Sequence, residues 1–367
     1  MANRPKFAAL KQLICDTFRQ SSASGIFWMM LAVTALCVLL CLSVKVSGDA
    51  PIYAKDEPGF FLPPKLPRDY APSVVLVLGS SGSLDAITRT AVSGRQVWFS
   101  LSVNPSLEKS EGIETVSGKM TLAFGAIAIP VGRERADSVR FLELLLAGGV
   151  AGTFGLLLAL VWTAGFLPTF LEPSAASVLL AKPVARWRLL LGKYFGVLTF
   201  VGFQVVLFVI LTWLALGVRT QIWDMNYLWC IPLLLLQFAI FYGFSVLLAV
   251  LTRSTVACVF GSVLFWLLAW GINYGSVMAR GMPETQSLSR PTLYLAQAAY
   301  WVSPKPIDAG LILFNALDAK AHFEKPLVFQ YLEAGNGFSP FLSILSSFLL
   351  TGVLLALSAY EFKHMDY

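Results

Sequence analysis

The sequence predicts an all-α polytopic membrane protein with six transmembrane helices and a small β-rich extracytoplasmic domain between helices 1 and 2. The first observation is composition: of 367 residues, 57% are hydrophobic and only 13% are charged, whereas a soluble domain has about a quarter charged residues. The second is a set of apolar runs, each long enough to cross a bilayer. The third is one hydrophilic region, residues 48–140, in which short strand-like runs alternate with turn signals.

These observations divide the chain into consecutive regions. They are an amphipathic interfacial helix (1–25), transmembrane helix 1 (26–47), the extracytoplasmic β-rich domain (48–140), transmembrane helices 2–5 with a cytoplasmic loop at 165–196 (141–275), an extracytoplasmic or interfacial segment (276–340), and transmembrane helix 6 with a cytoplasmic tail (341–367). The apolar spans themselves are expected at 26–44, 144–166, 194–218, 227–251, 256–275 and 341–360.

The first 25 residues have the pattern of a basic amphipathic helix that lies in the membrane interface. Their large apolar residues recur at helical spacing, and the lysines fall on other faces; the apolar set is Phe7, Leu10, Leu13, Ile14 and Phe18. The polar lead is long, and no small-residue cleavage site follows the first span closely, so a cleavable signal is excluded. We therefore favour an interfacial helix over a frayed tail.

The hydrophilic region opens with a proline-rich connector and continues with strand-like runs at 74–78, 96–103 and 120–131. Turn signals such as GSSGS at 79–83 separate these runs. A second segment, 293–317, is aromatic and apolar but has too many proline breaks for a seventh span, so it is expected to be interfacial or re-entrant.

The distribution of basic residues orients the chain. The 165–196 loop carries Lys182, Arg186, Arg188 and Lys193, whereas the short turn after the third span carries Arg219 alone. Because short cytoplasmic loops are enriched in Lys and Arg, both termini are expected in the cytoplasm.

No catalytic, cofactor-binding or metal site is expected on this chain. A P-loop needs GxxxxGK[ST], and the nearest text, at 112–120, is an ordinary β-turn. The only histidines are His322 and His364, so the hydrophilic region cannot build a Ser-His pair and no Cys or His cluster has metal-ligand spacing. A Ser-Lys hydrolase using Lys109 or Lys119 is not singled out by any spacing. The basic residues are scattered along membrane flanks, which argues against nucleic acid.

Three polar residues within the spans are candidates for lining a transport pathway: Gln204, Gln237 and Asn273. A polar side chain inside a span is costly unless it faces protein or water. Hydrogen bonds between helices explain each of them equally well. No series of Asp, Glu or His runs through the spans, which argues against proton-coupled transport.

The loop at 165–196 contains a short segment with its own helix signals. Pro173 suits the first turn of a helix, and Pro183 would end it, because a proline disfavours helix in the residue before it. The nine residues between them are small and aliphatic, enough for about two to three helical turns. Composition alone does not separate a docking helix from a plain basic loop.

This loop, together with the order of the spans, resembles the permease subunits of type-2 ABC exporters (the ABC-2 family). The sequence LEPSAASVLLAKPVARWRLLLGKY at 171–194 has their acidic residue, small-residue helix with a leucine pair, Pro-Val step, basic residue and Gly-Lys entry to the next span. The N-terminal segment is similar to their connecting helix, and the 303–308 element before the last span also agrees. The Pro173-Ser174 step and the size of the 48–140 region depart from the family pattern.

The resemblance implies that this loop is a coupling helix that contacts a separate ATPase subunit, which would hold ATP and Mg. The implied coupling residues are Glu172, Ser174, Leu179, Leu180, Lys182, Pro183 and Arg186. It also implies a second permease chain, as a homodimer or with a paralogue, membrane lipid around both, and residence in the bacterial cytoplasmic (inner) membrane. The basic residues would face either acidic ATPase surface or lipid headgroups.

The sequence leaves two other functions open. The first is a membrane-anchored scaffold or maturation factor that presents the 48–140 domain outside the membrane, and the second is a membrane-bound hydrolase. The transported substrate is not readable from the residues.

Overall fold

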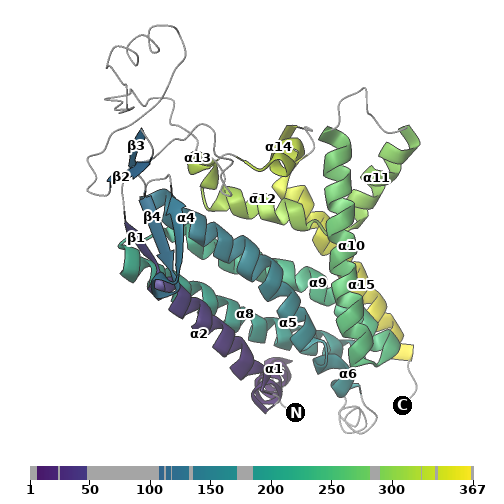
Figure 1. Ribbon diagram of the computed structural model, residues 1–367. Helices are drawn as coiled ribbons and strands as arrows, with labels where there is room; N and C mark the ends of the chain where they lie inside the picture. The colour runs from purple at the N-terminus through teal and green to yellow at the C-terminus, as the bar shows by residue number, and fades with distance from the viewer. Residues whose placement is uncertain are drawn as a thin grey trace.

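The computed structural model describes residues 6–23, 25–47, 107–110, 113–116, 118–131, 135–171, 185–281, 290–323, 325–334 and 338–364. These residues are mostly helical, and six of the helices are long and apolar enough to cross a membrane. The prediction of six spans is therefore confirmed. The first described helix and the end of the last described helix lie at one end of the helix bundle, here called the terminal end (Figure 1).

The N-terminal helix α1 (Lys6–Ala23) precedes the first span, α2 (Ile26–Ser43). The second span, Ser138–Phe170, begins within α4 and ends with α6. It is built from α4 (Arg135–Leu144), the π-helix η2 (Leu145–Gly155), α5 (Leu156–Thr163) and α6 (Phe166–Phe170). The third is α8 (Arg186–Thr220), and the fourth joins η3 (Met225–Trp229) to α9 (Cys230–Thr252). The fifth and sixth are α10 (Thr255–Gly281) and α15 (Pro340–His364).

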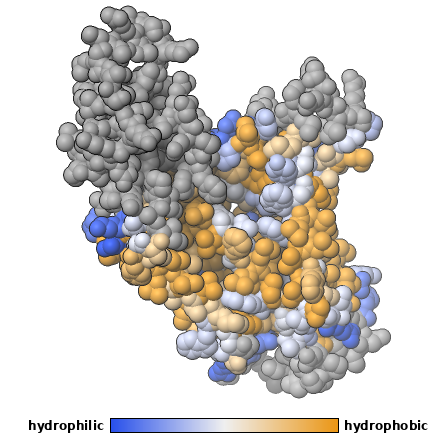
Figure 2. All heavy atoms as spheres, in the orientation of Figure 1, coloured by the Kyte–Doolittle hydropathy of each residue, from blue (hydrophilic) through white to orange (hydrophobic). Residues whose placement is uncertain are grey.

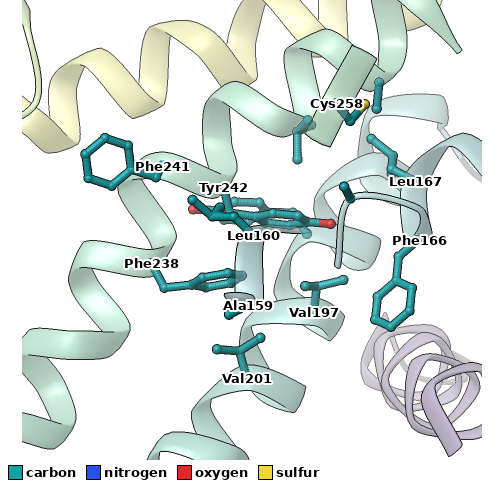
Figure 3. Close-up of a cluster of buried hydrophobic side chains, with 14 of the residues drawn as sticks. Ala159, Leu160, Phe166, Leu167, Val197, Val201, Phe238, Phe241, Tyr242 and Cys258 are labelled. Atoms are coloured by element: carbon teal, nitrogen blue, oxygen red, sulfur yellow. The ribbon is translucent and has the colours of Figure 1, made fainter. Parts of the chain in front are cut away.

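The fourth span is the centre of the bundle. In the most apolar 18-residue stretch of the fourth span, 61% is buried inside the protein, compared with 17% in the fifth span. Its aromatic residues join a core built from α5, α8 and α9, in which Phe238, Val201 and Ala159 lie close together (Figure 3). Apolar side chains cover the visible outer face of the helices between two more hydrophilic ends (Figure 2), as a bilayer requires.

A π-helix, η2, occupies the middle of the second span, in a stretch that contains four closely spaced glycines (Gly148, Gly149, Gly152 and Gly155). A π turn closes i→i+5 bonds and is wider than an α turn, and the Thr153 hydroxyl donates across this interval to the Gly148 carbonyl at 3.1 Å. A Cβ on Gly152 would lie 2.9 Å from the Ala147 carbonyl oxygen. The glycine is therefore needed within its own helix, independently of any neighbouring one.

The described strands form a small sheet and a separate hairpin. Strand β1 (Lys45–Ser47) pairs antiparallel with β4 (Gly118–Leu122), which pairs antiparallel with β5 (Ile127–Val131). The hairpin consists of β2 (Leu107–Ser110) and β3 (Ile113–Val116). The expected run at 120–131 is thus two strands, and the expected strands at 74–78 and 96–103 lie outside the described residues.

A β-rich domain over the whole of 48–140 is not supported. The sheet takes β1 from the end of the first span, and it packs on the spans themselves: Met120 is buried with Cys41, Leu142 and Leu216. The Ser43 hydroxyl accepts a hydrogen bond from the Ala123 amide at 2.9 Å. From Arg135 the chain is already helical. The sheet is therefore attached to the bundle through β4, because Met120 is buried against α2, α4 and α8.

Four shorter helices follow the fifth span at the opposite end: α11 (Arg290–Val302), α12 (Pro306–Ala316), α13 (Ala319–His322) and α14 (Leu327–Ala334). Helix α12 is apolar but has only 11 residues, about half the length needed to span a bilayer. It lies across the opposite end of the bundle rather than along it (Figure 1).

Candidate functional site

The first candidate site is the terminal end, where the 165–196 loop begins and ends. Helix α6, helix α1 and the end of α15 lie there (Figure 1). Of the predicted coupling residues, the structure describes Arg186; the others, Glu172, Ser174, Leu179, Leu180, Lys182 and Pro183, lie outside the described residues. The site is therefore described through the residues that hold the two ends of the loop.

Arg186 begins α8 and reaches the last turn of the last span. Its Nη1 donates to the Lys363 carbonyl oxygen at 3.3 Å. Cationic side chains near a helix C-terminus satisfy carbonyl groups that the helix itself leaves unpaired. The contact joins the loop's exit to α15. The neighbouring Arg188 is exposed, with its guanidinium carbon 5.3 Å from the centre of the Trp187 ring.

Lys193, about two turns beyond Arg186 along α8, connects both ends of the loop to α1. It is only 4% exposed, and its Nζ donates to Gln20 Oε1 at 2.7 Å. Gln20 in turn donates from Nε2 to the Thr169 hydroxyl at 3.2 Å, on α6. The rings of Phe166 and Phe170 lie 5.7 and 5.8 Å from the ammonium group, within cation–π range.

Ring contacts complete this junction. Phe18 of α1 meets Phe200 at 5.4 Å and Phe203 at 6.0 Å between ring centres, both edge-on. The amphipathic N-terminal helix is therefore docked on α8 through its apolar face. The sequence analysis counted Lys193 among the basic residues of the loop. No local sequence pattern indicates that it pairs with a glutamine on α1.

The second candidate site is a half-open pocket of about 140 Å³ within the spans, lined by residues of α2, η2, α5, α8 and α9. Two of the three predicted pathway residues, Gln204 and Gln237, line it. Gln204 is 3% exposed, and neither its Oε1 nor its Nε2 has a hydrogen-bond partner among the described residues. Each unsatisfied buried group costs about 1–3 kcal/mol.

Gln237 also lines a second cavity of about 320 Å³ on the other side of η2, between α9, α10, α12 and α14. Three aromatic residues of α10 line this second cavity: Trp266, Trp270 and Tyr274. The Trp270 and Tyr274 rings are stacked at 5.2 Å, and Trp266 Nε1 is buried with no acceptor within the described part of the chain.

Asn273 has a different place. It is fully buried, its Nδ2 donates to Asp308 Oδ1 at 3.2 Å, and its Oδ1 accepts from the Ile307 amide at 2.8 Å. It is a bridge between α10 and the start of α12, the alternative that sequence reasoning left equally open.

Asp308 is the centre of the third polar site, which we call the Asp308 cluster (Asn273, Tyr300, Asp308 and Ser343). Its Oδ2 accepts from the Tyr300 hydroxyl at 2.6 Å and from the Ser343 hydroxyl at 2.5 Å. The cluster ties α10, α11, α12 and α15 together, and the buried carboxylate is bonded as a buried charge must be. Within the ranges that the structure describes, no group of His, Cys, Asp and Glu could hold a metal ion.

Comparison with known proteins bears on these sites as a set. The family model described as "ABC-2 family transporter protein" matches residues 17–367, which include all six spans and both ends of the loop. Comparison with curated proteins found no match. Because the family match extends over nearly the whole multi-pass chain, the chain belongs to the ABC-2 family of transporter proteins.

Proposed function

We propose that this chain is the permease subunit of an ATP-driven ABC exporter of the bacterial inner membrane, with the terminal end and both termini in the cytoplasm. ABC-2 permeases work with an ABC ATPase subunit, and in this proposal ATP and Mg are bound by that separate subunit. The observation that carries the proposal is the junction at the terminal end, where the loop is bonded at both ends to other helices.

The ATPase would dock on the 165–196 loop through Glu172, Ser174, Leu179, Leu180, Lys182, Pro183 and Arg186. Lys193 bonds Gln20, and Gln20 bonds Thr169, so a displacement of the loop would move α1, α6 and α8 as one unit. The Arg186 contact to the Lys363 carbonyl would carry the same displacement to α15. Tightly packed elements transmit small shifts in this way, because cores do not deform continuously.

Two permease chains, identical or paralogous, would form the transport pathway in contact with membrane lipid. Gln204 and Gln237 are the residues we assign to a pathway, because they line one pocket within the spans. Asn273 would act indirectly, by fixing α12 against α10.

Affinity purification of the tagged full-length chain in mild detergent tests the proposal. We expect a Walker-motif ATPase to co-purify and its ATP turnover to rise in the complex. Leu180→Asp in the loop should abolish both, whereas Met225→Asp, an exposed position on η3 away from the loop, should leave both unchanged. Purification of a folded chain with no ATPase would contradict the proposal and would favour a scaffold or maturation factor.

A further inference from the structure

We infer that the turn η1 (Ala123–Gly125), at the tip of the β4–β5 hairpin, anchors the sheet to the bilayer surface. The Phe124 side chain inserts among the phospholipids at the end of the bundle opposite to the terminal end. The partner is a lipid surface. The inference needs only that the six spans cross a membrane, so it does not depend on the permease assignment.

The register of the sheet places this turn level with the last turn of the first span. Strand β1 follows the end of α2, and β4 runs antiparallel to it with Thr121 opposite Lys45, so the chain returns toward α2 as it approaches the turn (Figure 1). The Ala123 amide then donates to the Ser43 hydroxyl at 2.9 Å. Ser43 ends a helix of 18 residues, about 27 Å long, which is close to the thickness of the hydrocarbon core. The turn therefore lies at the boundary between hydrocarbon and headgroups.

The residues around the turn have the composition of a membrane interface. Lys45 is exposed, and Arg219, at the end of α8, donates from Nε to the Val44 carbonyl oxygen at 2.9 Å. Two basic residues therefore lie near the level of the turn. Trp223 and Trp229, which follow α8 at the same end, are also exposed. Basic and aromatic residues are typical of the flanks of membrane spans, where they contact headgroups.

Phe124 points away from the protein. Its side chain is 80% exposed, whereas Met120 and Leu122 of β4 pack on the cluster formed with α2, α4 and α8. Its backbone is left-handed, with φ 57° and ψ 29°, a conformation that is unfavourable for a bulky residue. The protein itself provides little contact to offset this strain. Contact with acyl chains does so, because removing an aromatic ring from water is favourable.

The insertion is shallow. An irregular turn cannot enter the hydrocarbon with unpaired backbone groups. The Ala123 amide is bonded to Ser43, and the Ala126 amide donates to the Ala123 carbonyl oxygen at 3.2 Å. Gly125 is exposed, so headgroups and water can bond its backbone while the neighbouring ring reaches the acyl chains.

A nitroxide spin label at position 124 measures the depth of the turn. The full-length Phe124→Cys chain would also carry Cys15→Ser, because Cys15 is the exposed cysteine and the other four are buried. In phosphatidylcholine nanodiscs, we would measure the label's accessibility to oxygen, which concentrates in lipid, and to a water-soluble nickel chelate. The same label at Leu264, exposed on α10, and at Lys320, exposed on α13, provides the lipid and water references. We expect position 124 to admit oxygen and to exclude most of the chelate that reaches position 320.

Phe124→Asn separates a lipid contact from a turn that only reverses the chain. Asparagine tolerates a left-handed backbone better than phenylalanine does, so the backbone alone predicts unchanged or slower amide exchange in the hairpin. If Phe124 holds the hairpin on the bilayer, loss of the ring should instead speed exchange in β4 and β5 about tenfold. Phe124→Trp keeps an aromatic side chain that suits the interface and should exchange as the unchanged protein does. The amides of α9 serve as the internal reference.

Equal access of the chelate to positions 124 and 320 would overturn the inference, because the side chain would then lie in water. Exclusion of both reagents from position 124 would also overturn it, since protein, such as a second copy of the chain, would then cover the side chain. Unchanged or slower exchange in Phe124→Asn would show that lipid does not hold the hairpin. None of these results bears on capture of an ATPase, so failure of this inference and failure of the proposed function are distinguishable.

Discussion

Replacing Lys193 by Met removes the ammonium group that bonds α8 to α1 and indirectly to α6, while it keeps an apolar stem against the Phe166 and Phe170 rings. A hydrogen bond to a charged group is worth about 1.5–3 kcal/mol. Part of this gain is offset, because the variant no longer buries an ammonium group that is only 4% exposed. Gln20 Oε1, which accepts this bond at 2.7 Å, then turns to water. We therefore expect α1 to lose about 1–2 kcal/mol of docking free energy, with a smaller effect on the whole fold.

Amide hydrogen exchange measures this loss. A change of 1–2 kcal/mol in the opening free energy corresponds to about 5–30-fold faster exchange in α1, and the amides of α9 should not change. In the proposed complex, stimulated ATP turnover should fall together with α1 protection. The control Lys320→Met, at an exposed site on α13, should alter neither. Equal α1 exchange in Lys193→Met and the unchanged protein would refute the view that this lysine holds the junction together.

The remaining predictions concern the fold around the sites. Gly152→Ala should lower stability by about 1–3 kcal/mol, because its Cβ would meet the Ala147 carbonyl oxygen at 2.9 Å; Gly149→Ala, whose Cβ would only touch a side chain at 3.4 Å, should be nearly neutral in thermal unfolding. Asp308→Ala should cost at least about 1–3 kcal/mol, since it leaves three buried donors without their acceptor. Glu361→Ala, an exposed acid on α15, is its control. A melting shift no larger than the control's would contradict the role given to the carboxylate.

The six spans could be predicted from sequence because a bilayer requires a fixed length of apolar helix. Their ends could not. Helix α8 begins at Arg186 rather than at 194, and α10 continues to Gly281 rather than to 275, because a helix can continue through polar residues beyond the apolar run that hydropathy detects. The π-helix could not be predicted from the sequence. Glycines that a π-helix needs for its own backbone and glycines that allow a neighbouring helix to approach closely give the same sequence pattern.

The sequence indicated which polar residues lie within the spans but not which residues they contact. Of the candidate pathway residues, Gln204 and Gln237 line the same pocket, whereas Asn273 bonds Asp308. The prediction of a separate β-rich domain at 48–140 was wrong because β1, which completes the sheet, follows directly on the first span. Lys193 and Gln20 are 173 residues apart, and no local pattern reports a contact over that distance.

The central claim, that an ATPase drives this chain through the 165–196 loop, is tested most directly by photocrosslinking in intact membranes. A photoreactive amino acid would be placed at position 180 in the loop, and at position 225 on η3 as the control. The account predicts that position 180 captures a Walker-motif ATPase, that the yield changes when ATP is added, and that position 225 captures none. Absence of any ATPase adduct at position 180, with the chain intact in the membrane, would contradict it.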